Sequence, residues 1–309
     1  MSAGIVQLVC IGAQDEYIVG SPEISFFNST FKRHSNFSQS IEKQIIHGHV
    51  KNNSLSTIRI ERSGDLLGYT YFTIDNGGQA MDTTNWESLI ESVQLVIGGQ
   101  VIDEQDSTFC ENIAVDLLAQ NLSKCSNGPH PGGSTASSYF YPLRFFFCEG
   151  AQSAIPLTAL QYHDVELRVR WGSSAANYSW ECHSNYYYLD NEERGNIASR
   201  SHDMLIYQVQ KNIGSGDHIQ SLNFNHPVKF IVSSNNSGTS PLTSTSNRIK
   251  LSINGVDLSN YKWARPHFMD VSHYYHTNYV TSPDIFMHPF CITTSLHQPT
   301  GSLNFSRIE

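Results

Sequence analysis

The residues best placed for metal chemistry are two histidines that one residue separates, His47 and His49. On a β-strand this spacing directs both imidazoles to the same face, where they could ligate a metal ion. A site of this type also needs a carboxylate a few residues further on, but Asn53 and Ser54 occupy that stretch and the next acid is Glu61. The sequence therefore predicts a surface strand that carries two histidines, and no metal site.

Two pairs of adjacent carboxylates, Asp103-Glu104 and Glu192-Glu193, are candidates for acid–base chemistry. Adjacent side chains on a strand point to opposite faces, so such a pair does not converge on one substrate. We interpret the first pair as a solvated turn and the second as a helix start. The segment Gly214-Ser215-Gly216 lacks the G-x-S-x-G spacing of a nucleophile elbow, and no G-x-x-x-x-G-K phosphate loop occurs. We expect no catalytic residue and no cofactor.

Imidazole and basic side chains gather at two further places. His273 and His276 lie in the string VSHYYHTNY and are weak candidates for catalysis. Lys32, Arg33 and His34 form a basic corner that could face phosphate, lipid head groups or an acidic patch on a neighbouring protein. A solvated corner is the equally weighted alternative.

The composition limits the class of protein. The chain has 309 residues, enough for about two domains, and a formal net charge of -9, which disfavours a groove for nucleic acid. Six cysteines are scattered without a C-x-x-C pair, so free thiols in a reducing compartment are expected. We find neither a secretory signal nor an apolar run of the ~20 residues that span a bilayer, and expect a soluble chain made in the cytosol.

The hydrophobic pattern predicts many short strands joined by polar turns. Val165, Leu167 and Val169 alternate with charged residues, as in a strand of a β-sandwich. Gly98-Gly99 predicts a turn between two strands, and residues 108–118 have the apolar spacing of a short helix. The polar stretches 123–138 and 233–247 are expected to be surface loops.

Five separated segments resemble the major capsid proteins of large double-stranded DNA viruses that infect algae and other protists. The first contains QLVCIGAQDEYIVG and ends at a basic corner, the second contains IPLTALQYHDV, the third YYYLDNEER, the fourth LNFNHPVKF and the last HQPTGSLNFSRIE. They occupy Gln7–Phe37, Ala154–Val165, Tyr186–Arg194, Leu222–Val232 and His297–Glu309.

This resemblance implies an all-β fold, a double jelly roll of two tandem antiparallel β-sandwich barrels. We expect an N-terminal arm over residues 1–24, a first strand from about Ile24, and a first jelly-roll domain over 25–200 that ends in a helical link. A second jelly-roll domain would cover 201–309. Members of the family usually continue beyond the last of the five segments, so we expect the second barrel to lack its closing strands.

The resemblance also implies a structural function without enzymatic activity. Three copies would form a pseudo-hexagonal capsomer that tiles an icosahedral shell, contacting neighbouring capsomers and minor capsid proteins. The arm would lie near an inner viral membrane, and no specific binding of nucleic acid is expected. The chain would be located in the virion after assembly in the host cytoplasm.

Two alternatives remain open from the sequence. A lectin-like jelly roll could hold carbohydrate on the aromatic faces of Trp171, Trp180 or Trp263. A cupin-like metalloenzyme could use His47 and His49.

Overall fold

The computed structural model describes most of the chain and divides it into two compact units. The described residues are 13–75, 86–129, 139–214, 218–234, 242, 246–280 and 285–307. The first unit ends at Asn36 and the second covers Phe37–Glu309. In the first unit, the helix α2 (Glu16–Val19) is the only regular element among the described residues, and all its side chains are exposed.

The predicted first strand around Ile24 is wrong, because strand β1 (Phe37–Gln44) begins later. Its partner β10 (Ser179–Leu189) ends opposite Phe37, so no neighbouring strand can accept hydrogen bonds from earlier residues. The first compact unit accordingly ends at Asn36, just before β1.

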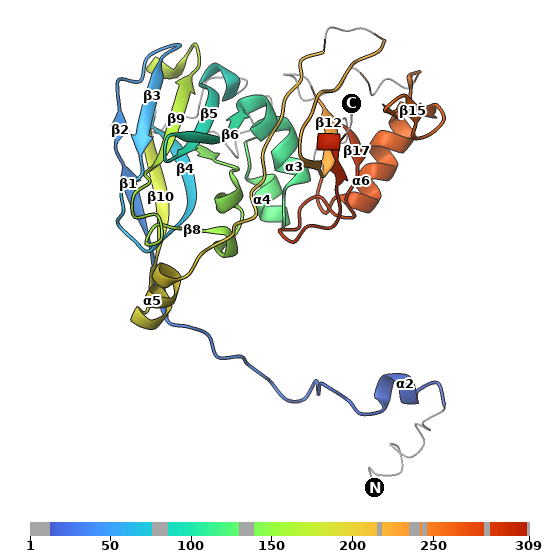
Figure 1. Ribbon diagram of the computed structural model, residues 1–309, viewed down its shortest axis with the longest axis horizontal. Coiled ribbons are helices and arrows are strands. Elements are labelled where there is room, and N and C mark those ends of the chain that lie inside the picture. Colours follow the sequence, from blue (N-terminus) through green and yellow to red (C-terminus); the bar gives the residue numbers. More distant parts are fainter. Residues whose placement is uncertain are drawn as a thin grey trace. The chain divides into compact units, whose positions relative to one another are not determined.

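The first domain is a sandwich of two antiparallel five-stranded sheets (Figure 1). One sheet has the order β1-β10-β4-β7, with β8 also paired to β4, and the other has the order β2-β3-β9-β5-β6. Strands far apart in sequence lie side by side, as in the two Greek keys of a jelly roll. The remaining strands are β2 (Ile46–His47), β3 (Leu55–Arg59), β4 (Leu66–Asp75), β5 (Ile90–Ile97), β6 (Gln100–Asp106), β7 (Phe140–Pro142), β8 (Ile155–Pro156) and β9 (Val165–Trp171).

The β5–β6 hairpin confirms the predicted Gly-Gly turn. Gly98 and Gly99 have φ values of 59° and 83°, which only glycine adopts without strain. In β9, Val165, Leu167 and Val169 are buried, as the alternation predicted.

The core lies between the two sheets and is rich in aromatic side chains. Trp171 is fully buried, with ring centroids 4.7 Å from Trp180 and 6.0 Å from Phe72. The Trp171 indole nitrogen donates to Ser56 Oγ at 2.8 Å, so the one polar atom of the ring is satisfied.

Two cysteine thiols are sealed in the same core. Cys110 and Cys182 are 1% and 0% exposed. Burial raises the pKa of Cys110 to about 12 and raises the pKa of Cys182 further, so both remain protonated. No disulfide involves either sulfur.

Several short helices interrupt the strands of the first domain. The predicted helix over 108–118 is present as a π-helix, η2 (Phe109–Ala114), followed by α3 (Val115–Leu117). The expected surface loop over 123–138 is wrong at its start, where α4 (Leu122–Ser126) buries Cys125; residues 130–138 lie outside the described residues. The other 3-10 segments here are η1 (Trp86–Ser88), η4 (Phe146–Cys148), η5 (Ala151–Ser153) and η6 (Ala175–Asn177).

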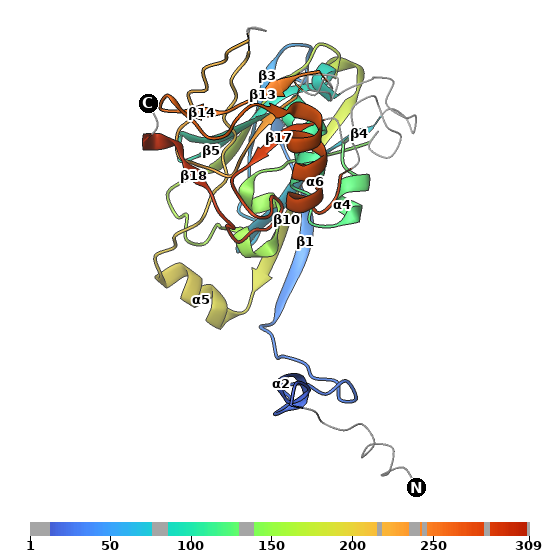
Figure 2. The same ribbon diagram turned by 90° about the vertical axis from the view of Figure 1, so that its right-hand side faces the viewer.

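Helix α5 (Asn191–Ser199) leaves the first domain, and an irregular linker follows it to the second domain (Figure 2). The described residues of the second domain form four separate two-stranded antiparallel ladders. The ladders are β11 (Pro227–Val228) with β18 (Leu303–Asn304), β12 (Phe230–Ser233) with β17 (Phe286–Pro289), β13 (Arg248–Ile249) with β16 (Lys262–Trp263), and β14 (Ser252–Ile253) with β15 (Val256–Asp257). The π-helix η8 (Pro266–Asp270), α6 (Val271–His276) and η9 (Phe305–Arg307) complete it.

Among the described residues, no helix has the length and apolar character needed to cross a bilayer.

Candidate functional site

The two histidines with metal-ligand spacing do not share a strand. His47 ends β2, and Gly48 follows it with a φ of 103°, which turns the chain before His49. His47 borders a depression of about 340 Å³ that Glu61 and Asp164 also line, and Asp164 is already paired with Arg59 and Arg62. Within the described ranges, no cluster of three or more His, Cys, Asp or Glu side chains could hold a metal ion.

The interpretation of Asp103-Glu104 as a solvated turn is wrong, because both residues lie in β6. Asp103 is buried, whereas Glu104 is exposed and accepts hydrogen bonds from Ser92 and Gln94. The prediction for Glu192-Glu193 is confirmed, since both lie in the first turn of α5.

Nor do the other candidates form a reactive arrangement. His273 Nε2 donates to the carbonyl oxygen of Ile285 at 2.8 Å, and His276 Nδ1 contacts the carbonyl oxygen of Ile292 at 3.0 Å. The basic corner at 32–34 is exposed within the arm, and of Gly214-Ser215-Gly216 only Gly214 lies in the described residues.

The lectin hypothesis was wrong about two of its three tryptophans. Trp171 and Trp180 are buried in the core and cannot stack on a sugar. Trp263 is partly exposed, but the guanidinium of Arg248 covers its ring at 4.2 Å.

The best-organised polar contacts join the interdomain linker to β6. Gln208 Nε2 donates to the carbonyl oxygen of Ile102 at 2.6 Å, and the Val209 amide donates to Asp103 Oδ1 at 2.9 Å. Burial raises the pKa of Asp103, although the hydrogen bond from Val209 opposes that shift. The edge of the first sandwich therefore holds the linker through backbone and side-chain groups.

The same linker also contacts the second domain. Tyr207 donates its hydroxyl hydrogen to the carbonyl oxygen of His297, and the ammonium of Lys229 lies 4.7 Å from the centre of the Tyr207 ring. Lys229 in turn donates to the carbonyl oxygen of Thr294 at 2.9 Å. One short segment therefore contacts both domains within three residues.

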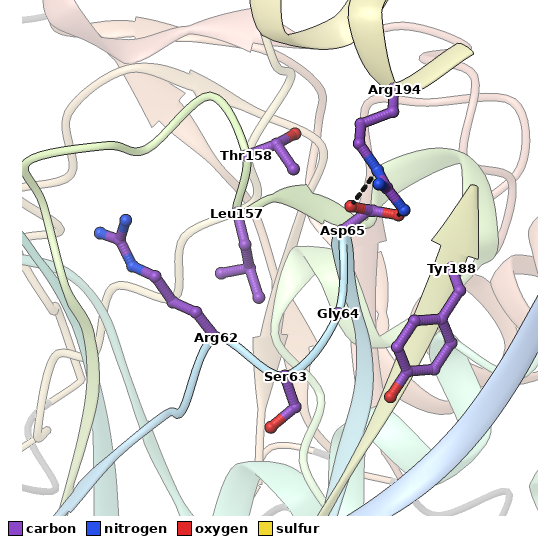
Figure 3. A pocket seen from close by; sticks show the side chains of 8 residues that line it. All are labelled: Arg62, Ser63, Gly64, Asp65, Leu157, Thr158, Tyr188 and Arg194. Atoms are coloured by element: carbon purple, nitrogen blue, oxygen red, sulfur yellow. Dashed lines mark hydrogen bonds and ion pairs between the residues drawn. The ribbon is translucent and has the colours of Figure 1, made fainter. Parts of the chain in front are cut away.

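A second polar cluster ties α5 to the first domain (Figure 3). Arg194 points from α5 toward Asp65, with Nε 2.8 Å from Oδ1 and Nη2 3.0 Å from Oδ2. Asp65 Oδ2 also accepts a hydrogen bond from the Leu189 amide at 2.8 Å, at the end of β10. Asp65 also lines the adjoining depression of about 340 Å³, where its two carboxylate oxygens are already occupied by these contacts.

Replacing Asp65 with alanine is expected to lower the free energy of unfolding by about 2–3 kcal/mol. The change removes a bidentate ion pair and leaves the Leu189 amide without its acceptor. Urea denaturation followed by circular dichroism measures this loss.

The matched control is Asp164→Ala, which removes the partly exposed ion pairs with Arg59 and Arg62. Exposed pairs contribute about 0–1 kcal/mol, so this variant should remain close to wild type. Equal losses in the two variants would contradict a special role for Asp65.

The outer surfaces of the two sheets differ in chemistry. The sheet that contains β5 and β9 has a charged face, on which Arg168 pairs with Glu166 and Arg170 with Glu91. The opposite sheet has an aromatic face. Its members are Phe37, Ile41, Tyr69, Tyr71, Phe140 and Tyr187.

The rings of the aromatic face touch one another across three strands. Tyr71 lies 5.3 Å from Phe140, 5.4 Å from His183 and 6.3 Å from Tyr69, measured between ring centres. Outer faces of antiparallel sheets are ordinarily polar when they meet water, so a contiguous aromatic surface indicates a partner.

The jelly-roll sandwich, the second β-domain fixed beside it and these contrasting faces define a structural protein that acts through its surfaces. Residues 25–208 match the family described as "Major capsid protein N-terminus". The chain belongs to this family of major capsid proteins.

Relatives and solved structures agree with this assignment. A major capsid protein of Pyramimonas orientalis virus is 32% identical, over 100% of this chain and 90% of the relative. A major capsid protein of Paramecium bursaria Chlorella virus 1 is 29% identical, over 100% and 86%. In a quasi-atomic structure of the PBCV-1 virus capsid, one chain superimposes with a TM-score of 0.73 at 24% identity, covering 92% of this chain and 85% of that one. This fold is the double jelly roll expected from the sequence.

Proposed function

We propose that this chain is a structural capsid protein, three copies of which form a pseudo-hexagonal capsomer that tiles an icosahedral virus shell. The observation that carries the proposal is the pair of β-domains held side by side by the linker contacts at Tyr207, Gln208 and Val209. Three copies of a two-domain chain present six similar edges, which suits hexagonal packing.

The domain boundaries belong to this proposal. Residues 25–200 would act as the first jelly roll with its helical link, and residues 201–309 as the second. The linker contacts support a boundary after α5, because residues 207–209 already bind both domains.

The proposed partners are other copies of the chain, neighbouring capsomers and minor capsid proteins. The arm supports a further contact with an inner viral membrane, because it exposes apolar side chains beside the basic corner. These apolar residues are Tyr17, Ile18, Val19, Ile24, Phe26, Phe27 and Phe31. The chain would assemble in the host cytoplasm, act in the virion without catalysing a reaction, and bind no specific nucleic acid.

The purified chain is expected to form a trimer, with a mass three times the 34.7 kDa of one copy. Obligate interfaces bury large areas, so the trimer should persist on dilution to micromolar concentrations. Native mass spectrometry and light scattering after size-exclusion chromatography measure this. A chain that remained monomeric at every concentration would overturn the proposal.

A further inference from the structure

One edge of the aromatic face, at strand β1, lies away from the second domain. The linker binds β6, and β7 lies on that same side, because Tyr141 of β7 contacts Ser107, the residue after β6, at 3.2 Å. Strand β1 is at the opposite edge of its sheet from β7. Figure 1 shows β1 and β2 at one end of the body formed by residues 37–309 and α6 and β15 at the other, and Figure 2 shows α6 in front with β1 behind.

Exposure on this face is large for apolar side chains. Phe37 is 53% exposed and Ile41 48% exposed, both on the edge strand β1. The ring of Phe37 lies 6.4 Å from that of Tyr187, which extends the aromatic surface along β10. One ion pair borders it, between Lys43 and Glu181, and Glu181 also contacts His183 of the ring cluster.

The far end of the second domain presents a second apolar surface on α6. Tyr274 and Tyr275 are 79% and 70% exposed, and their ring centres are 4.9 Å apart. Tyr261 and Trp263 are exposed nearby in sequence, but Lys250 and Arg248 cover their rings within the same domain. The α6 tyrosines are thus the aromatic groups best placed to bind another molecule.

We propose that the aromatic face binds α6 of a second copy of this chain, with Tyr274 and Tyr275 packed against Ile41 and its aromatic neighbours. This contact rests on the self-assembly proposed above and assigns surfaces to it. Two different patches at opposite ends make a head-to-tail contact, which repeats from copy to copy and closes into a ring when the rotation permits. Tyrosines that bury on association are frequent centres of binding energy.

The first test places a charge on each surface. Ile41→Asp and Tyr275→Asp are each expected to weaken the trimer at least tenfold, measured by sedimentation equilibrium or mass photometry across a dilution series. Leu55→Asp is the matched control, because Leu55 is an exposed aliphatic residue on the outer surface of the other sheet. It should leave the trimer intact.

Thermal melts check that every variant folds. If Ile41→Asp fails to fold, Tyr275→Asp still tests the contact, because its position on α6 is highly exposed.

The second test pairs opposite charges across the proposed contact. Ile41→Lys alone should weaken the trimer as Tyr275→Asp does, and the double variant Ile41→Lys with Tyr275→Asp should recover most of the affinity. A double variant as weak as the sum of its single changes would overturn the pairing.

The outcomes separate this contact from the proposed function. A wild-type chain that stays monomeric overturns the assembly and the contact together. A wild-type trimer that survives both Ile41→Asp and Tyr275→Asp overturns the contact alone and leaves the structural role standing.

Discussion

Replacing Trp171 with alanine is expected to lower the free energy of unfolding of the first domain by about 3–5 kcal/mol. The fully buried indole touches Trp180 and Phe72 between the two sheets, and its loss leaves a cavity that the rigid sheets cannot close. The Ser56 hydroxyl also loses its donor. Because domains are stable by only about 5–15 kcal/mol, the variant should unfold at a much lower urea concentration.

Two variants control this experiment. Trp263→Ala removes a partly exposed ring and its contact with Arg248, so about 1 kcal/mol or less is expected. Trp171→Phe keeps most of the packing but loses the hydrogen bond to Ser56, and should fall between wild type and Trp171→Ala. A loss for Trp171→Ala no larger than that for Trp263→Ala would contradict the assignment of Trp171 to the core.

The second large effect is a dependence of stability on pH that comes from Glu111 in the π-helix η2. This side chain is 2% exposed and accepts a hydrogen bond from the Trp86 amide. Burial raises its pKa from 4.5 to about 8, and the nearby Glu87 adds to the increase. An acid whose pKa rises on folding keeps its proton to a higher pH in the folded state than in the unfolded state. Its contribution to the stability of the folded state is therefore fully present below about pH 4.5. It is lost as the pH rises through about 8, and the loss amounts to at most about 5 kcal/mol.

Glu111→Gln tests this dependence, because it keeps an acceptor for Trp86 and removes the ionisable group. The variant should gain stability relative to wild type when the pH is raised from about 5 to about 8, as measured by urea denaturation at each pH. Glu104→Gln, on the exposed side of β6, should follow the wild-type profile. A constant difference between Glu111→Gln and wild type across this range would show that Glu111 does not titrate there.

Local patterns predicted one strand and one hairpin turn of the first domain correctly. The alternation of Val165, Leu167 and Val169 and the Gly98-Gly99 turn each determine local geometry within a few residues. The fold class came from the resemblance of five segments to the capsid family, and the structural comparison confirms it.

Contacts between distant residues could not be predicted in this way. Asp65 and Arg194 are 129 positions apart, and the sequence around either residue does not predict the ion pair between them. Asp103 was assigned to a turn because its acidic neighbour suggested solvent, whereas its actual partner is a linker amide 106 positions away. The end of the arm depended on where β10 stops, which is a property of pairing and not of the residues around Ile24.

The second domain shows the same limit. Ile249, Leu251 and Ile253 alternate as in a single strand, but β13 ends at Ile249 and β14 begins at Ser252 with a different partner. Asn254-Gly255, a pair typical of hairpin turns, connects β14 to β15 with φ values of 50° and 74°. A tight turn can thus be predicted from two residues, whereas the pairing partner of a strand is determined by the tertiary structure.

The buried thiols of Cys110 and Cys182 can report how often the first domain opens. A protonated thiol out of reach of solvent reacts with neither disulfide reagents nor oxidants, so modification must wait for the two sheets to separate. The rate of labelling at these positions would measure how often a barrel opens, in a free copy and in an assembled particle alike.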